Sequence, residues 1–394
     1  VGNDQIGGDR FLYLPSSYGA ASDSGVNKYN FGLASNPYTS LMIVENKIGN
    51  PDLTWEKAKK MNVGVDINLF NNCLTASFDI FKEKRNNILA NRSTSPMIIG
   101  ANLPAYNFGE MENRGWEMDL NFRHHIQDFH YWARFNYSFA RNEIIYMDEV
   151  QKRYDYQMTT GRRKNQFFGL IFDGYYNSWE EINALDRPKS SWSGNQLQPG
   201  DVKYVDVNQD GVIDDYDMVP IGYTPVPEII YGFSFGAQYK GFDFSILFQG
   251  ADNVSIKYFG RSMWPFAKGE ESAKSLIKER WTQERYEAGE KITFPRLSLN
   301  PNGETDHNYR PSTLWIRDAS YLRLKNLEVG YTFTGGFVKR LNLNSVRLYF
   351  NGSNLFTWTD VVDLDPEAPS RSGNVEINTY PLQKVYNIGL NINF

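Results

Sequence analysis

The sequence predicts an all-β fold, and more specifically a transmembrane antiparallel β-barrel with long extracellular loops. Apolar and polar residues alternate along many segments of the 394-residue chain. These segments run to about 13–20 residues, whereas strands of globular sheets average about 5–6. Short and long connections also take turns along the chain. Together these observations indicate long strands that run up and down between two unlike ends.

Alternation is clearest in "MNVGVDINL" (61–69), where every odd position is apolar and Asn62, Asp66 and Asn68 are polar. The chain ends on the same pattern in "VYNIGLNINF", which places Phe394 on the apolar face. A period of two gives a strand one apolar and one polar face. We expect nine strands, near residues 54–69, 74–89, 107–124, 128–146, 228–240, 241–258, 314–333, 343–357 and 382–394.

The connections separate a barrel from the alternative, a soluble antiparallel sandwich, which would alternate too. The short links are 70–73, 124–128 and 240–241, and the long links are 90–106, 147–227, 259–313 and 358–381. In an up-and-down order, the short links fall at one end and the long links at the other, as in outer-membrane barrels. The polar faces carry Asp, Asn, Arg and Glu, which suit a wet lumen better than a packed core.

Two local departures from the strand pattern are also visible. In "YLRLKNLEVGYTF" the alternation changes phase between Leu324 and Leu327, which predicts a β-bulge. Helical patterns occur only inside the long links, at 179–185 and 271–281. No linker divides the chain, so residues 1–394 are expected to form one unit.

Composition excludes several classes of protein. The net charge of −5 argues against a nucleic-acid binder. Cys73 is the only cysteine, so the chain holds neither an internal disulfide nor a cysteine-based zinc site. No stretch approaches the roughly 18 consecutive apolar residues of a transmembrane helix. The first residues, "VGNDQIGGDRF", show no signal peptide and no initiator Met, which leads us to expect a mature or truncated chain.

The dodecapeptide "DVNQDGVIDDYD" (206–217) has the spacing of a calcium-binding loop. Calcium takes six to eight hard oxygen ligands around a tight turn. The expected ligands are Asp206, Asn208, Asp210, the Val212 carbonyl, Asp214 (directly or through water) and Asp217, with Gly211 at the sixth position. Without convincing flanking helices, we expect a structural calcium clip rather than a sensor. The alternative is an Asx-rich turn without metal.

Other candidate residues carry weaker signals. Aromatic residues of the long links could stack on sugars or contact a partner, or they could pack against one another; they are Tyr175, Tyr176, Trp179, Trp192, Trp264 and Phe266. His124, His125, His130 and His307 show no metal spacing, and we expect solvated turn residues. Ser234 in "GFSFG" matches a hydrolase motif but lies in mid-strand, without the sharp strand-to-helix turn that a nucleophile needs. No catalytic residue is expected.

Several segments together resemble the C-terminal part of SusC/RagA-type TonB-dependent transporters, outer-membrane proteins of Bacteroidetes. The segments are "PDLTWEKAKKMNVGVDINLFNNCLTASFDIFKEKRNNIL" (51–89), "NRGWEMDLNF" (113–122), "PGDVKYVDVNQDGVIDDYD" (199–217), "IRDASYLRLKNLEVGYTF" (316–333), "LYFNGSNLFTWTD" (348–360) and the terminal "INF". Their ordered series is more specific than any one of them, and it covers nearly the whole chain.

The resemblance implies a barrel of about 22 strands, of which this chain would supply about nine. The plug domain and the first barrel strands would then be absent from this chain and supplied by the remaining N-terminal part of the transporter. It also implies integration into outer-membrane lipids, a SusD-like lipoprotein as a lid and energy from the TonB–ExbB–ExbD complex. The implied function is active import of a bulky nutrient, with no enzymatic activity.

Two other functions stay open at this point. The implied cargo is an oligosaccharide, with a peptide as the alternative within the same family. From a different class, a soluble, calcium-stabilised β-protein that binds or hydrolyses glycans would also carry the dodecapeptide and the alternation.

Overall fold

The computed structural model describes most of the chain. The described residues are 13, 18–20, 28–33, 38–41, 43–45, 49–94, 103–192, 196–258, 264–266, 275–298, 306–362, 364–367, 374–375 and 382–394. The predicted helical segment 271–281 begins outside these ranges, as do parts of the long links. No described helix has both the length and the apolar character needed to cross a membrane.

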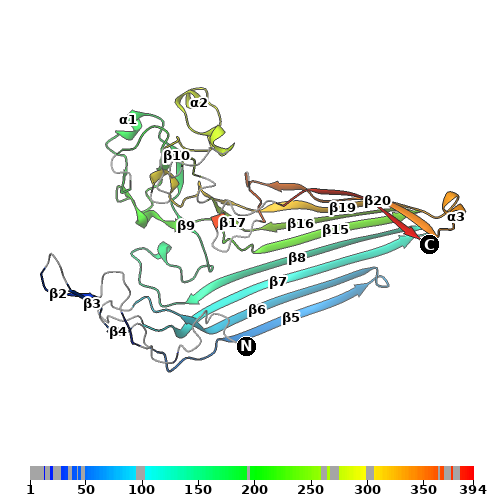
Figure 1. Ribbon diagram of the computed structural model, residues 1–394, viewed down its shortest axis with the longest axis horizontal. Helices are drawn as coiled ribbons and strands as arrows, with labels where there is room; N and C mark the ends of the chain where they lie inside the picture. The colour runs from blue at the N-terminus through cyan, green and yellow to red at the C-terminus, as the bar shows by residue number, and fades with distance from the viewer. Residues whose placement is uncertain are drawn as a thin grey trace.

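One antiparallel sheet dominates the described residues, and its nine strands lie side by side in chain order (Figure 1). From one edge to the other these strands are β5 (Lys57–Leu69), β6 (Leu74–Ala90), β7 (Tyr106–Ile126), β8 (Phe129–Tyr146), β15 (Ile229–Tyr239), β16 (Phe242–Asp252), β19 (Tyr321–Phe333), β20 (Ser345–Thr359) and β22 (Val385–Asn393). All nine predicted strands are therefore confirmed, and their order is that of an up-and-down barrel wall.

Two predicted strands are too long, because each one divides between two sheets. The predicted strand 241–258 ends with β16 at Asp252, since Asn253 takes a left-handed φ of 54°. The residues beyond it form β17 (Ser255–Tyr258), which pairs with β18 (Ile316–Asp318) in a separate sheet. The predicted strand 314–333 is divided in the same way between β18 and β19.

The predicted bulge is confirmed in β19. Phe248 pairs with Leu324 and Leu247 with Asn326, so Lys325 is the extra residue. The register with β20 shifts at the same place, where Asn354 has a φ of 55°. A bulge restores the alternation on both sides of it, and Leu327 therefore shares a face with Leu324.

The short links form tight turns at one end of the sheet. Lys240 and Gly241 join β15 to β16 with positive φ values of 44° and 91°, as a two-residue hairpin turn requires. A further link, between β19 and β20, contains α3 (Phe337–Arg340), which the sequence pattern did not predict. In Figure 1, α3 and the C-terminus lie at this end, and the long loops gather at the opposite end.

The register gives the sheet one apolar and one polar face. One apolar row crosses eight strands through Ile67, Ala76, Leu120, Phe135, Phe233, Phe248, Leu324 and Phe356. The next row is polar or small and consists of Asp66, Ser77, Asp119, Asn136, Gly232, Gln249, Arg323 and Thr357. Many apolar side chains on the first face are exposed, including Val63 and Ile388. An exposed apolar band of this extent fits lipid contact.

Short elements fill the loop regions and the N-terminal segment. The strands are β1 (Tyr18–Ala20), β2 (Lys28–Phe31), β3 (Tyr38–Leu41), β4 (Ile43–Glu45), β9 (Phe168–Gly169), β10 (Phe172–Tyr175), β11 (Lys189–Ser190), β12 (Val202–Tyr204), β13 (Val212–Ile213), β14 (Val219–Pro220) and β21 (Asn374–Val375). The helical turns are η2 (Asp155–Gln157), α1 (Trp179–Ile182), η3 (Asp215–Asp217), η6 (Ser275–Glu279), α2 (Gln283–Glu287) and η8 (His307–Tyr309). The predicted helix at 179–185 is thus confirmed in a shorter form, and η6 lies within the predicted helix at 271–281.

The main hydrophobic core lies in the loops rather than in the sheet. Leu170, Val202, Phe294, Tyr309 and Trp315 are almost completely buried and pack together, although they come from three distant parts of the chain. The described parts of the loops between β8 and β15 and between β16 and β19 therefore fold as one packed body. Such a body at the end of a barrel can hold binding residues in fixed positions.

Candidate functional site

The dodecapeptide lies in this packed loop body and includes β13 and η3. Its backbone turns around its own side chains: Asp206 Oδ2 accepts from Gly211 N at 2.8 Å, and Asp210 Oδ1 accepts from Val212 N at 2.9 Å. Gly211 has a φ of 83°, which most other residues adopt only with strain. The sequence spacing therefore produces a tight acidic loop, as predicted.

The fit of this loop to a cation is mixed. Asp206 Oδ1 is buried and has no hydrogen-bond partner among the described residues, which makes it a suitable ligand for a cation. Asp217 is completely buried, and both its carboxylate oxygens accept backbone N–H groups, from Val207 and Asp214. Burial, with the Asp206 charge as a further cause, raises the pKa of Asp217. Across the described residues, no three His, Cys, Asp or Glu side chains converge closely enough to hold a metal.

The six aromatic residues that were candidates for cargo contact differ in how far they are buried. Tyr175 and Tyr176 are buried, and Trp192 and Trp264 pack against the loop core. Arg310 covers Trp192, with its guanidinium carbon 4.1 Å from the ring centroid. Trp179 is 57% exposed, and Phe266 is half-buried. Packing thus explains four of the rings, and contact with cargo stays a prediction that Trp179 suits best.

His307 corrects one expectation, because it is a buried residue and not a solvated turn residue. Its Nε2 donates to the Val202 carbonyl at 2.8 Å, so its Nδ1 accepts from Ser190 Oγ at 2.9 Å. Burial lowers the pKa of His307 below its ordinary value of 6.5, against the raising effect of Asp201 and Asp306. The neutral His307 ring therefore connects η8 to β11 and β12 through these two hydrogen bonds. The other three histidines lie exposed near the short turn after β7, as predicted.

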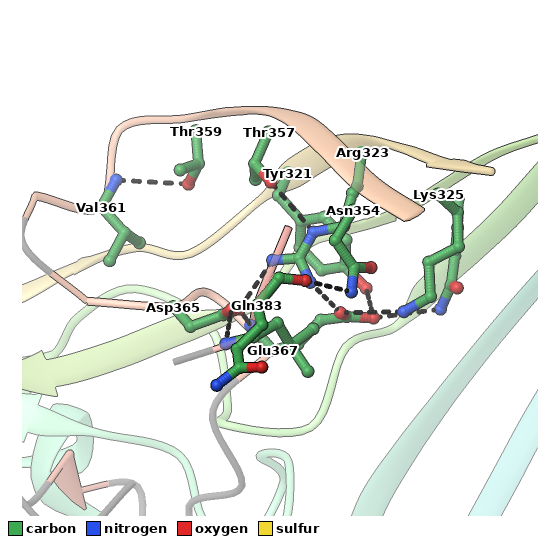
Figure 2. A network of polar contacts seen from close by, with 12 residues as sticks. Tyr321, Arg323, Lys325, Asn354, Thr357, Thr359, Val361, Asp365, Glu367 and Gln383 are labelled. Carbon is green, nitrogen blue, oxygen red and sulfur yellow. Dashed lines mark hydrogen bonds and ion pairs between the residues drawn. The ribbon is translucent and has the colours of Figure 1, made fainter. Parts of the chain in front are cut away.

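Figure 2 shows a polar network that ties a loop to the polar face of the sheet. Arg323 of β19 is buried, and its guanidinium binds Asp365 Oδ1 at 2.7 Å and Glu367 Oε2. Glu367 also accepts from Tyr321 Oη at 2.8 Å and from Gln249 Nε2 at 3.2 Å. Although burial favours the neutral acid, hydrogen bonds from Arg323 and two backbone N–H groups lower the pKa of Asp365. The network fixes the loop after β20 above the polar face.

A second charged cluster lies where β15 begins. Glu228 is buried and accepts from Arg141 Nε and Nη2, at 2.9 and 2.8 Å, and also from Arg163 Nε. Asn253 Nδ2 is 3.2 Å from the same carboxylate. This cluster joins β8 to the start of the long loop and to the end of β16.

A cavity of 380 Å³ lies beside the second cluster, between Glu56, the strands β6–β8 and the loop residues 163–164 and 224–228. Its charged lining is Glu56, Glu83, Arg85, Glu112, Arg163, Lys164 and Glu228, and its apolar lining includes Ile88, Met111, Ala140, Val226 and Pro227. The size is within the range of small-ligand sites.

The sequence did not reveal these networks or the cavity. Alternation places Arg323 on the polar face, but nothing in "DLDPEAP" shows that Asp365 and Glu367 reach it. Glu56 falls within the predicted strand 54–69, but β5 begins only at Lys57, so the alternation of the strand does not determine its burial. Pairing between residues more than 40 positions apart depends on how the loops fold.

These features define the wall of a membrane barrel with a packed loop body at one end. The family model for TonB dependent receptor-like β-barrels matches residues 14–355, and the chain belongs to this family. Such receptors are outer-membrane proteins and not enzymes, so the chain is part of an outer-membrane barrel. This result favours the predicted barrel over the soluble sandwich.

The chain is similar to TonB-dependent receptor P26 of Formosa agariphila, with 27% identity over 97% of this chain and 40% of the relative. It is 26% identical to TonB-dependent receptor SusC of Bacteroides thetaiotaomicron, over 98% of this chain and 36% of the relative. Among solved structures, the RagAB peptide importer in its open-open state matches with a TM-score of 0.66 at 23% identity, over 96% of this chain and 38% of that chain. The chain thus spans about two fifths of the length of these proteins and resembles the SusC/RagA type.

Proposed function

We propose that the chain forms the wall and outer loops of a barrel that imports a bulky nutrient across the outer membrane. The observation that carries this proposal is the pair of unlike faces on one nine-stranded sheet: one exposed and apolar, the other lined with carboxylates, amides and arginines. In a closed barrel the second face lines a polar passage. A passage of this width requires a plug, which the remaining part of the transporter would supply.

The proposed partners follow from the similarity to SusC and RagAB. A SusD-like lipoprotein would cover the loop end, and TonB with ExbB and ExbD would supply the energy that moves the plug. The packed loop body provides a rigid surface for the lipoprotein, since its core holds segments from two long loops together.

Oligosaccharide is the first cargo that we propose, because the resemblance to SusC/RagA-type transporters implies it and the exposed Trp179 ring can stack on a sugar. A peptide is the second candidate. It is supported by the similarity to a peptide importer and by the charged lining of the cavity beside Glu228.

Uptake by intact cells tests the proposed import. Cells with the intact transporter should accumulate labelled oligomers, and both deletion of its gene and collapse of the proton gradient should abolish accumulation. Binding of the oligomers to the cell surface should persist after the gradient collapses, because this binding precedes the step that consumes energy. Equal accumulation with and without the gradient would contradict active import.

We also propose that residues 206–217 hold a structural calcium ion. The spacing of the acidic residues and the buried, unpartnered Asp206 Oδ1 support this proposal. The ion would be held by the oxygens of Asp206, Asn208, Asp210, Val212, Asp214 and Asp217. Its contribution would be structural, since it would neutralise a cluster of like charges and stiffen the loop.

A further inference from the structure

The cavity between β6–β8 and residues 224–228 contains an acceptor that no described group satisfies. The Glu56 side chain is only 10% exposed, and its Oε1 is buried without a hydrogen-bond partner. Its Oε2 is 3.7 Å from Arg85 Nη1, which is a loose contact. A buried carboxylate oxygen without a donor is costly, so a site of this kind is suited to a ligand that brings one.

Glu83, the neighbouring acid in the cavity lining, differs from Glu56 because both of its carboxylate oxygens have cationic partners. Glu83 Oε1 accepts from Arg85 Nη2 at 2.8 Å and from Arg85 Nε at 3.2 Å, and its Oε2 is 3.2 Å from Lys60 Nζ. Glu228 is likewise held by two arginines. Among the acids that line the described cavity, Glu56 therefore combines burial with an unpartnered oxygen.

The charge of the lining also favours a cationic ligand. Glu112 pairs at 2.8 Å with Lys82, which lies outside the lining, and Glu83 and Glu228 pair with arginines. Glu56, with its loose contact to Arg85, is therefore the acid of the described lining whose charge is least compensated. Its other surfaces include the apolar side chains of Ile88, Met111 and Val226. The combination suits an ammonium group on a partly apolar molecule, because the charge would meet Glu56 and the rest would remove apolar surface from water.

We propose that this cavity is a cargo subsite in which Glu56 Oε1 accepts a hydrogen bond from a free ammonium group. The inference rests on the proposed import function and narrows its cargo to oligomers that carry an unmodified amine. The amine can belong to the amino terminus of a peptide or to an unacetylated amino sugar, and both would present the same –NH₃⁺ donor.

Calorimetry on the transporter purified from outer membranes with its partners tests this subsite. The probes are trialanine, N-acetyl-trialanine, a glucosamine tetramer and its fully N-acetylated form. We expect the free amine of at least one pair to bind about tenfold more tightly than its acetylated form, as a charge-assisted hydrogen bond implies. The pair that shows the difference identifies the source of the amine.

Two variants assign the effect to the cavity. Glu56→Gln keeps the size of the side chain and removes its charge, and it should reduce the tenfold preference to below about twofold. Glu110→Gln is the matched control, because Glu110 pairs with Lys84 outside the cavity lining and should leave the preference unchanged. Unchanged heat-modifiable migration on gels shows that both variants fold.

Equal binding of free and acetylated forms, or a preference that survives Glu56→Gln, would overturn the amine subsite, as would failure of all four probes to bind. Uptake separates this failure from failure of the proposed function. Cells with Glu56→Gln that import oligomers at the wild-type rate, with the proton gradient intact, would leave the import proposal in place and contradict the amine subsite. If wild-type cells show no energised import, the proposed function itself fails.

Discussion

Arg323 shows how a single residue can control the position of a loop. Its side chain is 2% exposed on the polar face of β19, and among the described residues its charge is balanced by the loop carboxylates of Asp365 and Glu367. Removal of one partner from a buried ion pair leaves the other charge without compensation, which costs about 3–5 kcal/mol. The sheet hydrogen bonds of β19 do not depend on this side chain.

Arg323→Met should therefore release residues 364–367 while the barrel stays folded. Hydrogen exchange at the Glu367 N–H, which Asp365 Oδ1 accepts at 2.9 Å, is expected to accelerate strongly. Lys325→Met is the control: Lys325 Nζ is 3.4 Å from Glu367 and more exposed, so its loss should change exchange little. Exchange that is unchanged in Arg323→Met would show that other contacts hold the loop.

His307 gives the loop core a predictable response to pH. Its folded pKa is lower than its unfolded value near 6.5, so the unfolded state binds a proton more readily than the folded state does. Stability is therefore full above pH 6.5 and is lost as the pH falls below this value. Protonation would also replace the acceptor that Ser190 Oγ uses with a second donor.

We expect hydrogen exchange in residues 202–204 and 307–309 to rise between pH 7 and pH 5, after correction for the intrinsic rate. His307→Gln should remove this dependence, since Gln does not titrate. Exchange that follows the intrinsic rate in the wild-type protein would contradict the assignment of a buried, neutral ring.

At the scale of elements, alternation predicted the strands well because the membrane and the lumen impose it directly on the sequence. The apolar row through Ile67 and Phe135 and the polar row through Asp66 and Asn136 are fixed by the period of two. The bulge at Lys325 could be predicted because it changes the phase of the same alternation. The split between β16 and β17 was not visible, because Ser255–Tyr258 keeps a strand pattern and only the left-handed Asn253 moves it to another sheet.

The loops were less predictable, since their buried residues pack by tertiary contact rather than by any period. Tyr175 and Tyr176 belong to two different buried clusters, although they are adjacent in the sequence. His307 is buried because the β12 backbone and Ser190 supply its partners from more than 100 residues away. The candidate cargo residues were accordingly predicted by residue type alone.

The acidic loop is the element in which a metal would matter most. Asp206→Ala together with Asp210→Ala should abolish terbium or calcium binding and loosen residues 147–227, and the barrel should stay folded. Limited proteolysis with and without a chelator measures the loosening. Asp186→Ala, in an exposed turn of the same loop, is the control and should retain both binding and protection. Global unfolding of the double variant would show that the site is misplaced.

At the scale of the whole molecule, the apolar face of the single sheet would contact lipid, and its polar face would line the proposed import passage. Two neighbouring residues of β5 represent these sides: Val65 on the apolar face and Asp66 on the polar face, both exposed. A soluble sandwich would instead leave water in contact with one face and bury the other.

The most direct test labels single cysteines with a fluorophore at positions 65 and 66, in a Cys73→Ser background, after reconstitution of the transporter into vesicles. Nitroxide-labelled lipid should quench the label at position 65, and aqueous iodide should quench the label at position 66. The same alternation is expected at positions 63 and 62. Equal quenching by iodide at adjacent positions, with none by lipid, would contradict a membrane-spanning wall with a polar passage behind it.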